Sequence, residues 1–189
     1  MNLSPQDAVV VLKLLAGGYK HWTYAQLGEE LALSPSQVFR SVERAEAVRL
    51  VDSGFRTVPP PPSPDLRSQD RPVLPWPNRE NLKEFLIHGV KYAFPAHRGG
   101  LVRGIPTAHA GPPLSKQIAE SFEPPPVWPD PEGTVRGLEF SPLYKNVPAA
   151  ARRDPKLYEL LALVDAIRDG RTREREIAIR ELTMRIDER

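Results

Sequence analysis

Residues 23–42, TYAQLGEELALSPSQVFRSV, decide the fold of the first part of this chain because they predict two short helices joined by a tight turn. Thr23 and Gln26 form a capping box, in which each side chain accepts a hydrogen bond from the backbone amide of the other residue. Ser34 and Gln37 repeat the device, and the proline between them sets a helical φ in advance. The pattern predicts two helix starts that lie eleven residues apart.

The apolar residues of this stretch fall on one face of each predicted helix. They step by three or four positions, as a buried stripe requires, and they are Tyr24, Leu27 and Leu31 in the first helix and Val38, Val42 and Ala45 in the second. The opposite face of the second helix carries polar side chains, namely Ser36, Gln37, Arg40, Ser41 and Arg44. Such side chains donate to phosphates or to base edges in a major groove. We therefore expect this face to meet duplex DNA.

The two helices and their turn resemble the helix-turn-helix family. Gly28 stands where that family keeps a small residue so that the two helices can approach, and Val38, ten positions later, stands where it buries an aliphatic anchor. Ala32 departs from the family, which usually has glycine at this turn position to allow a positive φ. The turn is therefore expected to be strained or to differ slightly in shape.

The flanking segments add a third helix and a hairpin. Residues 3–16 form an apolar run with Ser4-Pro5 as its start signal, and two glycines end it. Residues 49–58 predict a short hairpin around a turn at residues 52–54. Three helices and a hairpin in this order resemble the winged helix-turn-helix regulators of the MarR-like kind, over roughly the first third of the chain. The resemblance implies a DNA-binding transcriptional regulator, and a repressor in particular.

The resemblance also implies DNA-contacting roles for named side chains. Gln37 and Arg40 are expected to read base edges, and Ser36 and Ser41 to contact bases or phosphate. The expected contacts to the DNA backbone come from Thr23, Ser34, Arg44, Arg49 and the wing residue Arg56.

A protein-docking role is the alternative, because winged helices also serve as docking modules. The first 56 residues carry six basic and six acidic side chains, so they have no general attraction to phosphate. Four of the six basic groups lie on the presumed reading helix or the wing, and such local clustering governs contact because distant charges are screened. The alternative function is an antitoxin-like module that neutralises a partner protein, with or without DNA binding.

Composition excludes several function classes. The chain has 189 residues, 40% of them apolar, and a net charge of +2, which is too weak to indicate a partner. It has no cysteine, which excludes disulfides, cysteine zinc sites and thiol catalysis. No apolar leader or membrane-length apolar run is present, so we expect a cytoplasmic protein that does not enter the membrane. No catalytic motif appears and the four histidines share no ligand spacing, so we expect no enzyme activity, no metal and no cofactor.

Two proline clusters divide the chain. A proline removes a backbone donor and restricts the residue before it, so such clusters disfavour long helices and central strands. We expect a mainly α protein with a winged helix-turn-helix domain at 1–58, a proline-rich linker at 59–77, a helix followed by a glycine- and proline-rich arm at 78–147, and a C-terminal helical region at 148–189. The aromatic residues Trp128, Phe140 and Tyr144 suggest that the arm is ordered and anchored.

Residues 97–111 form a glycine-rich segment with basic side chains. Glycines beside arginines let backbone amides approach an anion, and histidines titrate near neutral pH. The candidate residues for an anion or effector loop are His97, Arg98, Arg103 and His109. A plain surface loop remains the alternative, and an effector sensor is a third functional hypothesis.

The C-terminal region predicts two helices. The first begins at Asp154-Pro155 and ends at Gly170, and the second begins near Thr172 and carries interleaved arginines and acidic residues. Two antiparallel helices with exposed apolar stripes are typical of a dimer element, so we expect a homodimer, with partner-protein contacts as a further role. Residues 170–176 also resemble the tails of regulators encoded beside bacterial toxins.

Overall fold

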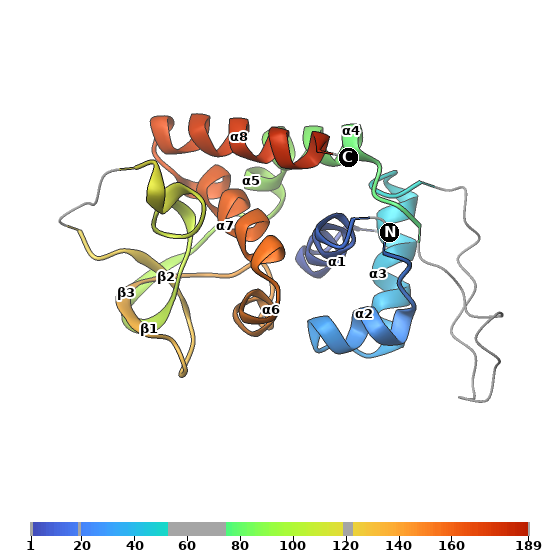
Figure 1. Ribbon diagram of the computed structural model, residues 1–189, viewed down its shortest axis with the longest axis horizontal. Coiled ribbons are helices and arrows are strands. Elements are labelled where there is room, and N and C mark those ends of the chain that lie inside the picture. Colours follow the sequence, from blue (N-terminus) through green and yellow to red (C-terminus); the bar gives the residue numbers. More distant parts are fainter. Residues whose placement is uncertain (1, 19, 53–74, 119–122, 189) are drawn as a thin grey trace. The chain divides into compact units, whose positions relative to one another are not determined.

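The computed structural model describes residues 2–18, 20–52, 75–118 and 123–188 (Figure 1). They divide into two compact units, Met1–Leu82 and Lys83–Arg189. Helices dominate the described residues, which confirms the mainly α class, and the strands form one small sheet. The segments expected as separate regions at 78–147 and 148–189 lie in one unit from Lys83 onward, and residues 78–82 belong to the first unit.

The first unit is built on three helices, α1 (Pro5–Ala16), α2 (Tyr24–Leu31) and α3 (Pro35–Ala47), with α1 and α2 both packed on α3. Both predicted apolar stripes are buried: Tyr24, Leu27, Leu31, Val38, Val42 and Ala45. Both predicted capping boxes are present, at Thr23 and Ser34. The local sequence signals therefore placed these helices correctly, because caps and stripes act within one or two turns.

The turn between α2 and α3 places Ala32 in the left-handed conformation, so of the two outcomes expected for this turn the structure shows the strained one. Ala32 has φ 53° and ψ 46°. The Leu33 amide donates to the Gly28 carbonyl at 2.8 Å. A Cβ at Gly28 would lie 2.5 Å from the Leu33 carbonyl oxygen. The small residue at position 28 is therefore needed to admit the backbone of the turn.

Replacing Ala32 with glycine is expected to raise the free energy of unfolding by about 0.5–1 kcal/mol. The left-handed conformation costs an L-residue about 1–2 kcal/mol, and the greater freedom of glycine in the unfolded chain offsets part of the gain. Urea titration of Ala32→Gly against the parent protein measures this. Ala25→Gly, at an exposed position inside α2, is the control and should lose about 1 kcal/mol. A loss in both variants would contradict strain at Ala32.

Of the hairpin predicted at 49–58, the structure describes residues 49–52. Arg49 has φ 59° and lies in the turn after α3. Val51 makes a single antiparallel bridge to Pro77. Residues 53–58, with most of the predicted wing, lie outside the described residues. So do residues 59–74 of the predicted linker.

The end of the predicted linker packs on the first unit. The Asp52 amide donates to the Trp76 carbonyl at 3.0 Å, and the Asn78 amide donates to the Leu50 carbonyl at 2.9 Å. Pro75 and Pro77 are buried. Residues 75–77 are therefore part of a folded contact.

The helix predicted to begin after Asn78 is confirmed, with an added irregularity. It runs as α4 (Arg79–Glu84), a π-helical turn η2 (Phe85–Gly89) and α5 (Val90–Ala93). The Asn78 side chain accepts from the Asn81 amide at 3.0 Å, as a cap does. The π turn has no signal in the apolar spacing, which fits an ordinary helix.

The second unit contains a three-stranded sheet that the sequence did not predict. Its strands are β1 (Arg98–Pro106), β2 (Pro126–Pro129) and β3 (Val135–Phe140). β1 runs antiparallel to both others, β2 and β3 are parallel, and the sheet closes on itself. The expectations of a glycine-rich loop at 97–111 and of an arm without strands were therefore wrong.

Close packing explains why a sheet forms from glycines and prolines. A Cβ at Gly104 would collide with the Trp128 carbonyl oxygen, and one at Gly137 would collide with the Pro125 carbonyl oxygen. The prolines lie at strand ends, where the missing amide costs little. Trp128 and Phe140 are fully buried, which confirms them as anchors.

Helices complete the second unit: short turns η3 (Ala108–Ala110) and η4 (Leu114–Lys116), then α6 (Val147–Arg153), α7 (Pro155–Asp169) and α8 (Thr172–Asp187). Asp154 caps α7 by accepting from the amides of Lys156 and Leu157. α7 packs against α8, so the predicted pair of helices is confirmed.

The apolar stripe of α7 is covered by the chain itself. Its residues are 0–4% exposed, namely Leu157, Leu160, Leu161, Val164 and Ile167. The exposed stripe from which a homodimer was expected is therefore absent from α7, and that reason for a dimer was wrong. No helix among the described residues has the length and apolar character of a membrane span.

Candidate nucleic-acid interface

The first two turns of α3 present a polar surface. Ser34, Ser36 and Arg40 are exposed and Gln37 is half-buried, whereas Val38 on the inner side is fully buried. α3 is held from beneath by α1 and α2, so these polar side chains stand on a packed helix. We call Ser34, Ser36, Gln37 and Arg40 the α3 surface.

The capping box uses one lone pair of the Gln37 side-chain oxygen and leaves its side-chain NH2 group without a partner among the described residues of the first unit. Its Oε1 accepts from the Ser34 amide at 2.9 Å, and the Ser34 hydroxyl oxygen accepts from the Gln37 amide at 3.2 Å. The Nε2 amide of Gln37 is left to donate to an outside acceptor. Gln37 therefore suits an acceptor such as purine N7 or thymine O4 through Nε2, and in a two-point contact to adenine its oxygen would be shared with the Ser34 amide.

One hydrogen bond within α3 holds the Nε end of the Arg40 guanidinium group. Its Nε donates to the Ser36 carbonyl at 3.3 Å. The two terminal guanidinium nitrogens remain as donors, which is the fork that matches guanine O6 and N7 or a phosphate.

The residues predicted to contact the DNA backbone lie on different elements of the first unit. Thr23 caps α2, where its hydroxyl oxygen accepts from the Gln26 amide at 3.3 Å, so its hydroxyl proton is left to donate. Arg49 is exposed, and its carbonyl accepts from Asn81 at 2.9 Å. Arg56 lies outside the described residues.

Ser41 and Arg44 do not belong to the exposed surface, and the expectation that they face DNA was wrong. Ser41 is 0% exposed and accepts from Gln6 Nε2 at 2.9 Å. Arg44 makes a two-point contact to Asp7, with Nε to Oδ2 at 2.8 Å and Nη2 to Oδ1 at 2.6 Å. These hydrogen bonds raise the pKa of the Arg44 guanidinium. Both residues join α3 to α1.

The sequence did not reveal the ion pair between Arg44 and Asp7, because the two residues are far apart in the chain. The sequence identifies Asp7 only as an acidic residue in the first turn of a helix. In the structure its carboxylate also accepts from the Ser4 amide at 2.7 Å. It is 0% exposed, so it needs a cation. Nothing in the spacing of residues along α3 distinguishes Arg44, which supplies that cation, from Arg40, which does not.

The second half of α3 is less suited to a polyanion than the first. Glu43 and Glu46 lie close enough to Tyr24 to add to the effect of burial, which is the main cause that raises the pKa of its hydroxyl to about 12. Tyr24 also packs edge-on against Phe39, with ring centroids 5.6 Å apart. The positive side of the helix is therefore its N-terminal half.

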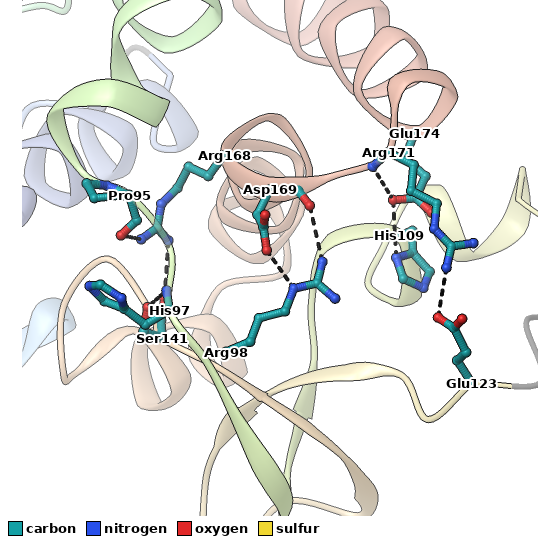
Figure 2. A network of polar contacts seen from close by, with 10 residues as sticks. All are labelled: Pro95, His97, Arg98, His109, Glu123, Ser141, Arg168, Asp169, Arg171 and Glu174. Atoms are coloured by element: carbon teal, nitrogen blue, oxygen red, sulfur yellow. Dashed lines mark hydrogen bonds and ion pairs between the residues drawn. The ribbon is translucent and has the colours of Figure 1, made fainter.

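In the second unit, three residues of the predicted anion loop, His97, Arg98 and His109, each contact a different partner (Figure 2). Arg98 donates to Asp169, with Nε to Oδ2 at 2.6 Å, and His109 Nδ1 lies 3.5 Å from Glu174 Oε2. The exposed His97 donates its backbone amide to Ser141. Arg98 and His109 thus already have carboxylate partners, and the predicted four-residue site is not assembled.

A buried polar cluster in this unit had no signal in the sequence. Asp165 accepts from Thr107 at 2.8 Å, from Trp128 Nε1 at 2.6 Å and from Arg168 Nη1 at 2.6 Å. Burial raises the pKa of the Asp165 carboxyl, and the three donors act in the opposite direction. Asp165 and Arg168 are 1% and 9% exposed, so an outside ligand does not reach them.

Arg168 extends the same cluster to the backbone. It donates to the carbonyl of Phe94 at 2.8 Å. It also donates to the carbonyls of Ser141 and Pro95, each at 3.2 Å (Figure 2). These contacts connect α7 to the residues that follow α5 and β3. The cluster therefore stabilises the packing of the second unit.

Over residues 2–18, 20–52, 75–118 and 123–188, no group of acidic and histidine side chains has the arrangement of a metal site. The chain matches no family model, no curated protein and no solved structure.

Proposed function

We propose that the first unit is a winged helix-turn-helix domain that binds duplex DNA in a sequence-specific manner, and that the protein acts as a transcriptional repressor. The observation that carries the proposal is the α3 surface, where four polar side chains stand exposed or half-buried on a helix packed through its other face. A recognition helix requires this arrangement, because its first residues enter the major groove while its back is held by the domain.

The roles follow from the free donors. Arg40 reads a base edge through its terminal nitrogens, and Gln37 donates to one acceptor on a neighbouring base. Ser36 donates to a base or a phosphate. Thr23, Ser34 and Arg49 position the DNA backbone, and the end of α3 that carries Ser34 is also the positive end of the helix dipole.

Arg40→Ala is expected to reduce the preference for specific over random DNA by about 1–3 kcal/mol, the contribution of one good base contact. A selection from a random duplex library with the purified protein supplies the specific sequence. Fluorescence anisotropy then measures the affinity of each variant for that duplex and for a scrambled one. Arg49→Ala is the matched control, since a phosphate contact weakens binding to both duplexes equally. An equal loss on both duplexes with Arg40→Ala would remove Arg40 from base readout.

A salt titration separates DNA binding from the antitoxin-like alternative. Each phosphate neutralised contributes about 0.9 to the slope of log affinity against log salt. Docking to a partner protein through apolar surface leaves affinity nearly independent of salt. A flat response in the DNA measurement would therefore argue against the proposed interface.

A further inference from the structure

Two arginines lie directly opposite each other in the sheet of the second unit. Arg103 on β1 pairs with Arg136 on β3 in an antiparallel register. Side chains directly opposite in such a pair stand on the same face, with Cβ atoms about 5 Å apart. Both residues are exposed. We call them the arginine pair.

The arginine pair lacks a counter-charge within the described part of the chain. Nearby arginines of the same unit do have carboxylate partners: Arg98 with Asp169, Arg152 with Asp130 and Arg171 with Glu123. Neither Arg103 nor Arg136 makes such an ion pair with a described residue. Like charges directly opposite across two strands destabilise a sheet. An oxyanion bound between the two arginines attracts both of them and so offsets their mutual repulsion.

The backbone under the arginine pair is held firmly. Each arginine precedes a glycine, Gly104 or Gly137, that is pressed against a carbonyl of a neighbouring segment. The Arg103 carbonyl also accepts from the Asp130 amide at 3.1 Å. These contacts hold the two strands together, so the Cα atoms of the two arginines keep their paired register, from which both side chains can reach one small anion.

An apolar pair adjoins the arginines on the same face. Leu101 pairs with Leu138 two positions along the two strands. Leu101 is 51% exposed. The face thus combines two cations, neither of them in an ion pair with a described residue, with an exposed apolar side chain.

We propose that Arg103 and Arg136 bind a phosphate group. The planar guanidinium fork matches phosphate oxygens, and two forks satisfy one phosphate from both sides. The phosphate comes either from a free phosphate or from the backbone of a nucleic acid. This site belongs to the second unit and is independent of the α3 surface.

The test uses the full chain with two matched double variants. Arg103→Gln/Arg136→Gln removes the pair, and Arg173→Gln/Arg180→Gln removes the same charge from exposed positions of α8. One arm titrates inorganic phosphate by calorimetry, and the other titrates a scrambled duplex over a series of salt concentrations. Thermal melting without ligand checks folding, and the first variant should melt no lower than the parent because a repulsion is removed.

If the site binds free phosphate, we expect Arg103→Gln/Arg136→Gln, and not the control variant, to lose at least about tenfold in phosphate affinity. If the site binds the backbone of a nucleic acid, we expect the slope of log affinity against log salt to fall by about 1.8 in Arg103→Gln/Arg136→Gln alone, since two phosphate contacts are lost. Equal behaviour of the two double variants in both arms would overturn the proposal. Discrimination between specific and scrambled DNA should persist in the first variant, so failure here is distinguishable from failure of the α3 surface.

Discussion

Arg168→Met is expected to lower the free energy of unfolding by about 3–5 kcal/mol, the largest effect that we anticipate in the second unit. The substitution keeps the apolar part of the side chain but leaves Asp165 as a buried charge without its cation. It also leaves the carbonyls of Phe94 and Pro95 without their donor. Urea denaturation measures the loss.

Arg98→Met is the matched control for this prediction. Arg98 also pairs with an aspartate, Asp169, but the side chains are 49% and 41% exposed. Solvent screens such a pair, so we expect a change within about 1 kcal/mol. Similar losses in the two variants would contradict a special role for the buried pair.

The loss in Arg168→Met should also depend on pH. Burial raises the pKa of Asp165 in the folded state, and removal of Arg168 takes away the strongest opposing influence, so the pKa rises further. A carboxyl whose folded pKa lies above its unfolded value loses stability as pH rises through the unfolded value toward the folded one. The deficit relative to the parent protein should therefore be larger at about pH 7 than at about pH 4. An equal deficit at both would show that the carboxyl charge is not the cause.

Arg44→Met is expected to lower the free energy of unfolding by about 3 kcal/mol, because Asp7 is then left buried without a cation. The estimate lies at the low end of the range since the Arg44 side chain is 23% exposed. Arg40→Met should leave stability nearly unchanged, because Arg40 is exposed and contacts only a carbonyl of its own helix. Chemical denaturation of the two variants compares them directly.

The double variant Asp7→Asn/Arg44→Met tests the cause. Asparagine keeps an acceptor for the Ser4 amide and removes the buried charge. The double variant should therefore recover much of the stability that Arg44→Met loses, with a coupling of about 1–3 kcal/mol. If Arg44 acted chiefly on DNA, its replacement would weaken binding and leave the unfolding transition where it was.

This contrast between Arg40 and Arg44 defines the proposed interface. The two arginines are four positions apart on the same helix, and the sequence assigned both to DNA. In the structure only Arg40 has free terminal donors on the exposed side, whereas Arg44 is committed to Asp7. The surface available to a groove is therefore the first two turns of α3.

The sequence by itself determined where α2, α3 and α7 begin. The capping boxes at Thr23 and Ser34 and the Asp154 cap of α7 depend on residues within a few positions of one another. Short-range hydrogen bonds and apolar spacing carry this information, so they can be read without a fold.

Only the tertiary structure decided which polar residues face outward. Asp7 meets Arg44 across 37 positions, Thr107 meets Asp165 across 58, and Arg103 faces Arg136 through strand register. The sheet itself forms where glycines admit a neighbouring carbonyl, which composition alone suggests to be a loop. Such pairings depend on the packing of distant segments, because a charge removed from water takes whatever partner the fold brings to it.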